Sequence, residues 1–167
     1  MSHQQEKPKF SFQLLTSEQF PSAIQLLKAA AEAMRNAGLY QWDEKYPNEA
    51  VVKTAIASND TYGYFIDNEL AGLVTLDERQ DPLYTPVHWK KTTGKIAVIH
   101  RLAVSPNYQG RGLGKIIMEL IHEKAKEKGF NSLRLDAFSS NPKIQKLYTD
   151  LGYNRCGEIF IYPERPA

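Results

Sequence analysis

The sequence predicts one domain of the mixed α/β (α+β) class, with a central mixed sheet of about six strands flanked by about four helices. A length of 167 residues suits a single domain. The expected elements follow in the order strand, two helices, three strands, helix, strand, helix, strand. Early neighbouring strands favour hairpins, and the later strand–helix–strand unit favours a parallel pair, so the sheet should be mixed. Residues 1–9 are expected to be a mobile polar leader and residues 10–167 the domain.

The N-terminal half contains a strand, two helices and a hairpin. Apolar residues at Ile24, Leu27, Ala31 and Met34 form a helical stripe, and Gly38 supplies its stop. Two later strand patterns are separated by a short polar turn, which predicts a hairpin. The expected elements are a strand over Phe10–Leu15, a helix from Ser17 or Pro21 to Asn36, a short helix over Glu49–Ala57, and strands over Tyr62–Ile66 and Leu70–Leu76.

The C-terminal half contains the strongest strand pattern of the chain. β-Branched residues dominate Ile96–Val104, and the segment Ser105-Pro106-Asn107 ends the strand. A glycine-rich stretch then leads into a long amphipathic helix, which Gly129 stops. The remaining expected elements are a strand over Leu133–Phe138, a helix over Pro142–Leu151 and a final strand over Tyr153–Tyr162.

The composition argues against several classes of protein. No apolar run reaches the ~18 residues that span a bilayer, and the leader lacks a hydrophobic signal core, so a cytoplasmic protein is expected. Cys156 is the only cysteine, which leaves no intrachain disulfide and no thiolate metal cluster. The four histidines show no metal-ligand spacing, and no metal site is expected.

Charge is balanced overall but separated along the chain. Lys and Arg total 21 against 19 Asp and Glu, which argues against a uniformly basic nucleic-acid module. Residues 41–81 hold nine acids and three bases, whereas residues 95–134 hold eight bases and three acids. This separation predicts two surfaces with different partners.

The most informative stretch is QGRGLGK, residues 109–115, between a buried strand and a helix. Three alternating glycines let backbone amides turn toward one point, where the helix N-terminus, Arg111 and Lys115 add positive charge. This pattern favours a pyrophosphate site over a plain turn, which would need one glycine. The fingerprint GxGxxG would need glycine at Lys115. The P-loop pattern would need glycine at Gln109 and a hydroxyl at Ile116, so neither pattern is met.

With the segment Ile-His-Arg-Leu-Ala-Val-Ser-Pro before it, this Q-x-x-G-x-G motif resembles the GNAT superfamily of N-acetyltransferases. The resemblance covers most of residues 10–162 by element order and is specific over 99–152. There the run Arg101–Lys115 is followed by Asn141 and by LYTDLGY, residues 147–153. It implies a GNAT-like sheet splayed between two parallel strands, and direct transfer of acetyl from acetyl-CoA to a primary amine of a small molecule or peptide, with CoA as product.

The same resemblance implies which residues hold the cofactor. The backbone of residues 102–104 pairs with the pantetheine amides, the glycine loop cradles the pyrophosphate, and Gln109 secures the loop. Asn141 places its amide near the cofactor, caps the following helix, or does both. The implied cofactor-binding residues are Leu102, Ala103, Val104, Gln109, Gly110, Arg111, Gly112, Leu113, Gly114, Lys115, Asn141 and Tyr148.

Two catalytic residues are implied. Through its place in the LYTDLGY motif, Tyr148 resembles the family's tyrosine acid. A phenol of pKa ~10 can donate to a thiolate of pKa ~8.5 when the two are held within hydrogen-bond reach; the alternative is a core aromatic. His100 shares strand parity with Leu102 and Val104, and an imidazole suits deprotonation of an ammonium group. A histidine satisfied within a half-buried strand is an equal alternative. A backbone amide near Val104 would polarise the thioester carbonyl. Cys156 is expected to be a buried strand cysteine rather than a nucleophile.

In the family, the loop between the first two helices and the connection after the third strand line the acceptor side. Here these are Tyr40–Pro47 and Asp77–Thr93, whose acids favour a cationic amine that an aromatic face could meet. The alternative is a solvated acidic rim with aromatics that pack the loops. The substrate-side candidates are Trp42, Asp43, Tyr84 and Trp89.

Three alternatives stay open beside the acetyltransferase. The chain could use a longer acyl-CoA, could be a catalytically silent CoA-binding regulator, or could bind nucleic acid through its basic segment. No nucleic-acid or membrane partner is expected. A homodimer that uses Ile159–Tyr162 as an edge strand is an open alternative to a monomer.

Overall fold

Five strands form one sheet in the computed structural model, which describes residues 6–42 and 47–159. The strand order is β1-β2-β3-β4-β5; the first four strands pair antiparallel, and β4 pairs parallel with β5. The mixed sheet expected from the sequence is therefore confirmed. The strands are β1 (Phe10–Leu14), β2 (Thr61–Ile66), β3 (Glu69–Asp77), β4 (Ile96–Val104) and β5 (Ser132–Arg134).

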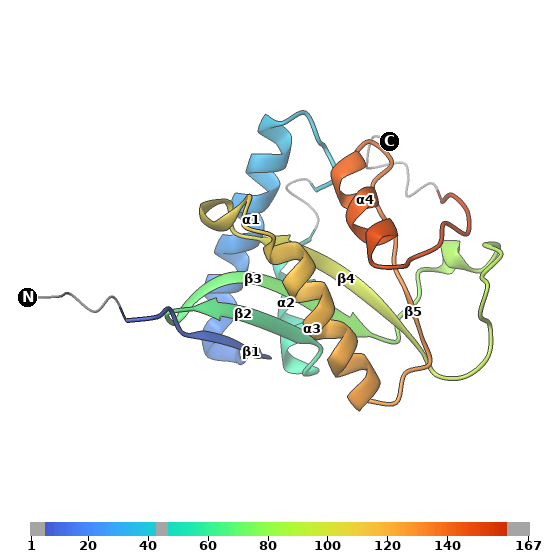
Figure 1. Ribbon diagram of the computed structural model, residues 1–167, viewed down its shortest axis with the longest axis horizontal. Coiled ribbons are helices and arrows are strands. Elements are labelled where there is room, and N and C mark those ends of the chain that lie inside the picture. The colour runs from blue at the N-terminus through green and yellow to red at the C-terminus, as the bar shows by residue number, and fades with distance from the viewer. Residues whose placement is uncertain (1–5, 43–46, 160–167) are drawn as a thin grey trace, which may run out of the picture.

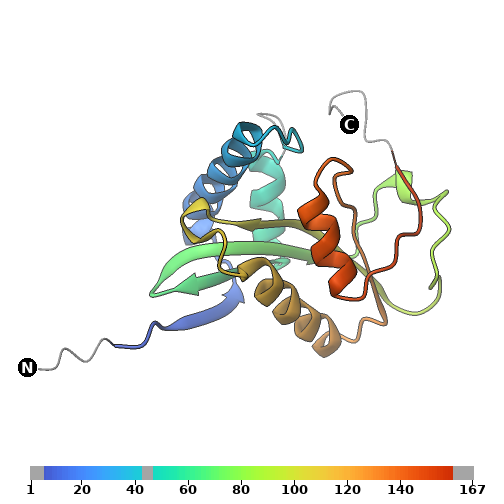
Figure 2. The same ribbon diagram turned by 45° about the horizontal axis from the view of Figure 1, so that its top comes forward.

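Four α-helices cover this sheet on its two faces (Figures 1 and 2). One face carries α1 and α2, and the other carries α3 with α4 beside it. Among the described residues, no helix combines the length and the apolar character needed to cross a bilayer. The helices are α1 (Phe20–Asn36), α2 (Glu49–Ala57), α3 (Leu113–Glu127) and α4 (Pro142–Asp150).

Capping and burial explain why the first two helices form where they do. Before α1, Thr16 and Gln19 form a capping box, and the helix buries Ala23, Ile24 and Leu27 against the sheet. The side chain of Asn48 accepts a hydrogen bond from the Val51 amide at 2.9 Å, which caps α2. These helices and the sheet face beneath them make up the first of two apolar clusters.

A bulge in β4 reverses the alternation of its side chains. Leu73 pairs with Ala103 but Thr75 pairs with His100, so β4 carries one extra residue across this stretch. The extra residue lies at Arg101, whose φ of 54° is left-handed. His100 consequently lies on the α1/α2 face with Ala103, whereas Leu102 packs on the α3 face. The expected parity of His100 with Leu102 and Val104 is wrong, because a bulge reverses which face each side chain occupies.

The sheet ends earlier at its C-terminal side than the sequence predicts. The strand expected over Leu133–Phe138 is only the three residues of β5, and residues 153–159 form no strand; residues 160–162 lie outside the described part. The ladder between β4 and β5 stops at the pair Val98 and Arg134. Without a neighbouring strand, backbone groups beyond that pair have no ladder to join. Cys156 accordingly lies half-buried in an irregular segment instead of a strand.

Candidate active site

The loop between β4 and α3 turns its backbone through two left-handed glycines. Gly110 has a φ of 77°, and Gly112, the N-cap residue of α3, has a φ of 74°. A Cβ added at either position would meet nothing within 4 Å, so the backbone conformation rather than space requires glycine there. The first backbone bond of the helix runs from the Ile116 amide to Gly112 at 3.3 Å. The preceding amides therefore have no acceptor within the helix, which is the geometry that binds anions.

Two exposed cations stand beside these amides. The Arg111 guanidinium lies 5.2 Å from the ring centroid of Tyr108, whose hydroxyl donates to Glu69 at 2.8 Å. The ammonium of Lys115 lies 3.9 Å from Glu119, and both side chains are exposed. An exposed pair of that kind contributes little, so Lys115 is available to a ligand at low cost.

Other predicted cofactor residues hold the loop and its neighbours in place. Gln109 donates from Nε2 to the Val104 carbonyl at 3.1 Å, which ties the loop to the end of β4. The Leu113 side chain is buried in the core, so only its backbone is available to a ligand. Asn141 accepts from the Ile144 amide at 3.2 Å and therefore caps α4, one of its two expected roles.

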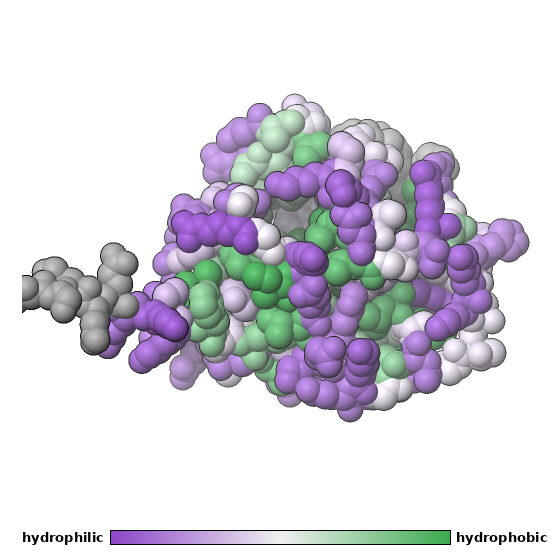
Figure 3. All heavy atoms as spheres, viewed as in Figure 1, coloured by the Kyte–Doolittle hydropathy of each residue, from purple (hydrophilic) through white to green (hydrophobic). Residues whose placement is uncertain are grey.

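β5 accompanies β4 only at the end of β4 that lies away from this loop (Figure 1). Their printed pairing covers only Ile96 to Val98 of β4, although that strand continues to Val104. Within the described residues, the segment Leu102–Val104 thus has a strand partner on the β3 side but none on the β5 side. Figure 3 shows the surface hollowed between the loop before α3 and helix α4. An extended ligand can lie along such an open strand edge.

Tyr148 lies on α4 in the apolar cluster between the sheet, α3 and α4. Its side chain is 9% exposed, and the ring of Tyr153 meets it edge-on with centroids 5.8 Å apart. The Tyr153 hydroxyl in turn lies 2.7 Å from His122 Nε2. Burial raises the pKa of Tyr148, and the Asp136 carboxylate raises it further, so the phenol keeps its proton well above neutral pH.

The aromatic residues expected on the acceptor side are largely engaged in packing. Tyr84 is 3% exposed and donates to Asp136 at 2.5 Å, and Trp89 donates from Nε1 to the Tyr84 carbonyl at 2.9 Å. The Arg134 guanidinium already lies over the Trp89 ring, 4.4 Å from the ring centroid. Trp42 is buried in the α1/α2 cluster. These positions agree with the packing alternative, while Asp43 lies outside the described residues.

His100 has a partner that the sequence did not reveal. Its Nε2 lies 2.8 Å from Asp77 Oδ1, an atom that also accepts the Arg79 amide at 2.8 Å. Burial would raise the pKa of Asp77, but hydrogen bonds from His100 and the Arg79 amide lower it below its ordinary value. Sequence reasoning counted Asp77 only among the acids of the acceptor side. The bulge places both side chains on one face of the sheet, where Asp77, the register partner of Val98, lies diagonally from His100, the partner of Thr75. Nothing in the local pattern indicates that bulge.

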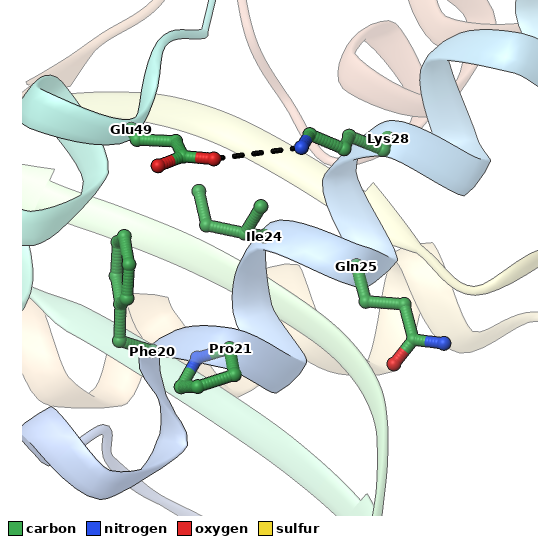
Figure 4. A pocket seen from close by; sticks show the side chains of 6 residues that line it. All are labelled: Phe20, Pro21, Ile24, Gln25, Lys28 and Glu49. Atoms are coloured by element: carbon green, nitrogen blue, oxygen red, sulfur yellow. Dashed lines mark hydrogen bonds and ion pairs between the residues drawn. The ribbon is translucent and has the colours of Figure 1, made fainter.

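A separate pocket of about 470 Å³ is lined by side chains of α1 and of the first residue of α2 (Figure 4). The ion pair between Lys28 and Glu49, 3.4 Å long, crosses it. Because α3 covers the opposite face of the sheet, this pocket is distinct from the glycine loop. Its lining residues are Phe20, Pro21, Ile24, Gln25, Lys28 and Glu49.

Unpaired amides at a helix start, an open strand edge and a buried tyrosine fit the class of acyltransferases that take a phosphate-bearing acyl carrier. The sequence model of the acetyltransferase (GNAT) family matches residues 39–153, and the chain belongs to that family. This match confirms the resemblance to the GNAT superfamily and the expected enzyme class, an N-acetyltransferase.

Known proteins of similar sequence and structure agree with this assignment. An uncharacterized N-acetyltransferase, YesJ of Bacillus subtilis, is 26% identical over 84% of this chain and 79% of its own length. A GNAT acetyltransferase from Streptococcus agalactiae superposes with a TM-score of 0.80, at 21% identity over 90% of this chain and 88% of that one. An N-acetyltransferase from Thermoplasma acidophilum, solved in complex with coenzyme A, has a TM-score of 0.67 at 19% identity, over 87% and 90% of the two chains.

Proposed function

We propose that the chain, acting as one domain over residues 10–167, transfers acetyl from acetyl-CoA directly to a primary amine of a small molecule or peptide. The observation that carries this proposal is the glycine loop, whose left-handed turns present the first amides of α3 beside the open edge of β4. The absence of any atom within 4 Å of a Cβ at Gly110 or Gly112 fits the close approach of a diphosphate.

The chain's own residues would hold the cofactor in two places. The backbone from Gly110 to Gly114, with Arg111 and Lys115, would bind the diphosphate. The backbone of Leu102–Val104 would pair with the pantetheine arm. The hydrogen bond from Gln109 to the Val104 carbonyl holds the glycine loop at a fixed position relative to this strand segment. The similar Thermoplasma protein was solved with coenzyme A, which supports the same cofactor here.

Acetyl-CoA supplies the acyl group as a thioester, and the protein supplies the proton transfers around it. His100 would take a proton from the acceptor ammonium, directly or through water, since only the free amine is nucleophilic. Tyr148 would donate to the departing sulfur. Because the pKa of Tyr148 is raised while a thiol has an ordinary pKa of about 8.5, the phenol donates a hydrogen bond more readily than it releases its proton. Its contribution would therefore be stabilisation of the developing thiolate.

The acceptor we favour is a cationic amine. Asp77 is the last residue of β3, and the exposed Glu78 and Asp81 lie in the connection that follows it. Their negative charge attracts an ammonium group, and the basic stretch on α3 lies on the other face of the sheet. Since Tyr84, Trp89 and Trp42 are engaged in packing, charge rather than an aromatic face supports this choice.

Two measurements test the proposed function. Acetyl-CoA at 100 times its Kd should stabilise the protein by about 2.7 kcal/mol in thermal unfolding, and free CoA should compete. Release of thiol across a panel of cationic, neutral and anionic amines should then identify the acceptor, with cationic amines preferred. Binding without thiol release for any amine would indicate a CoA-binding regulator. No stabilisation, with salt-dependent binding of an oligonucleotide, would indicate a nucleic-acid module.

A further inference from the structure

We propose that Asp77 is a positioning residue, which keeps the proton of neutral His100 on Nε2 and leaves Nδ1 to receive the proton of the acceptor amine. This inference rests on the proposed function, in which His100 is the base. It adds the residue that gives the imidazole its orientation and its tautomer.

The hydrogen bond between the two side chains determines the tautomer. His100 Nε2 lies 2.8 Å from Asp77 Oδ1, and an ionised carboxylate can only accept. The proton must therefore reside on Nε2, and Nδ1 carries the lone pair. The Arg79 amide donates to the same carboxylate oxygen at 2.8 Å, so backbone as well as imidazole holds the carboxylate in place.

Burial makes this contact stronger than a surface pair. The Asp77 side chain is 8% exposed and that of His100 is 21% exposed. A base that accepts a proton becomes an imidazolium, and the carboxylate beside it would stabilise that charge as a charge-assisted hydrogen bond. The partial exposure of His100 leaves part of the ring open to solvent, which a group exchanging protons with a substrate requires.

Other charged groups act on the pair from neighbouring segments. Arg79 and Arg101 lie near Asp77, and Asp60, which directly precedes β2, lies near both Asp77 and His100. Burial raises the pKa of Asp60, and the neighbouring Asp77 carboxylate raises it further, whereas Lys128 opposes the rise. Asp77, with its lowered pKa, is thus the carboxylate that stays ionised toward lower pH, and it is the one in contact with His100.

The bulge at Arg101 gives this pair its place relative to the cofactor site. It puts His100 and Asp77 on the α1/α2 face, while the side chains of Leu102 and Val104 point to the α3 face. The diphosphate cradle at the start of α3 and the base therefore serve opposite faces of the sheet. Two substrates could then approach from opposite sides and meet at the open edge of β4.

Nitrogen NMR of 15N-histidine-labelled protein tests the tautomer without any assay of activity. We expect the neutral His100 ring of the wild-type protein to carry its proton on Nε2. A neutral ring with its proton on Nδ1 would overturn the proposal. This measurement needs no variant, so it is independent of any folding defect, and it is independent of whether an acceptor has been found.

Kinetics of Asp77→Asn then test the role in catalysis. Asn is isosteric with Asp but uncharged, so we expect kcat to fall on the order of 10²-fold while the KM for acetyl-CoA stays within about twofold. In a His100→Gln background, the same change should cost little further, since Asp77 acts through His100. Glu123→Gln removes an exposed carboxylate on α3, away from the pair, and is the matched control, with activity retained. Full additivity of Asp77→Asn and His100→Gln would overturn the proposal, whereas absence of turnover in the wild-type protein would contradict the proposed function instead.

Discussion

At the scale of the residue, the surroundings of Tyr148 keep its phenol protonated, which suits the hydrogen-bond donor that we propose. The ring is buried among α3, α4 and the sheet, and the Tyr153 ring closes one side of it. Burial and the Asp136 carboxylate both disfavour the phenolate and raise the pKa of Tyr148. A phenol in that state stays protonated through the pH range in which a thiol ionises.

Replacement of Tyr148 by Phe should therefore remove a donor without removing the ring. We expect kcat to fall about 100-fold or more, with the Kd for acetyl-CoA changed less than about threefold. Because the pKa is raised, ionisation of Tyr148 should contribute no loss of wild-type activity up to about pH 10. Steady-state kinetics and equilibrium binding separate the two effects. Tyr64→Phe, another buried tyrosine of the same cluster, should keep full turnover, and unchanged kcat in Tyr148→Phe would remove the residue from the mechanism.

At the scale of the element, the turn into α3 combines a conformational requirement with a chemical one. Gly112 ends the loop in a left-handed conformation and begins the helix, and Gly114 follows inside the first turn. Only the first of these two needs glycine for its backbone. A Cβ at Gly114 would lie 3.5 Å from Leu147 Cδ2, an ordinary contact.

These two glycines form a matched pair for mutation. Gly112→Ala should lower the free energy of unfolding by about 1–2 kcal/mol, because an L-residue resists the left-handed region, and should weaken acetyl-CoA binding. Gly114→Ala should leave stability unchanged or raise it by up to about 1 kcal/mol, since alanine favours a helix. Chemical denaturation of both variants provides the comparison. Equal stability of the two variants would show that the turn relaxes without cost.

The strand β4 marks the limit of sequence reasoning at this scale. Its bounds, Ile96–Val104, follow from the β-branched run and the proline after it, and the structure confirms them. The bulge at Arg101 depends on how β3 pairs with β4, and no local signal marks it. The interpretation of His100 as a residue on the Leu102 face failed for that reason. Its association with Asp77, by contrast, follows directly from the observed register.

At the scale of the whole molecule, part of the charge that is separated along the chain lies on different faces of the sheet. The basic stretch includes the start of α3, where Arg111 and Lys115 are exposed beside the amides that we propose bind the diphosphate. Asp77, which belongs to the acidic stretch, lies on the α1/α2 face. An anionic cofactor and a cationic acceptor would thus each meet a favourable field.

Position along α3 should decide which lysine matters for the cofactor. Lys115→Gln, at the N-terminal end, should weaken acetyl-CoA binding roughly 2- to 5-fold, equivalent to ~0.4–1 kcal/mol, as expected for an exposed ion pair with a phosphate. Lys126→Gln removes the same charge near the C-terminal end of the same helix and should leave the Kd unchanged. Titration with acetyl-CoA at low and at high salt checks that the effect is electrostatic. The difference in Kd between the two variants should shrink as salt screens the charge of Lys115. Equal effects of the two changes would point to net charge alone.

The sequence by itself determined the order of elements as far as α4, the glycine loop at the start of α3 and the family motif that contains Tyr148, because these depend on local pattern and spacing. Tertiary structure decided the rest. It placed Trp42 and Tyr84 in packing rather than on an open surface, and it ended the pairing of β5 at Arg134. It also brought Asp77 to His100 through a bulge. Each of these outcomes depends on which neighbour a residue meets across the fold, and a neighbour distant in sequence leaves no mark on the local pattern.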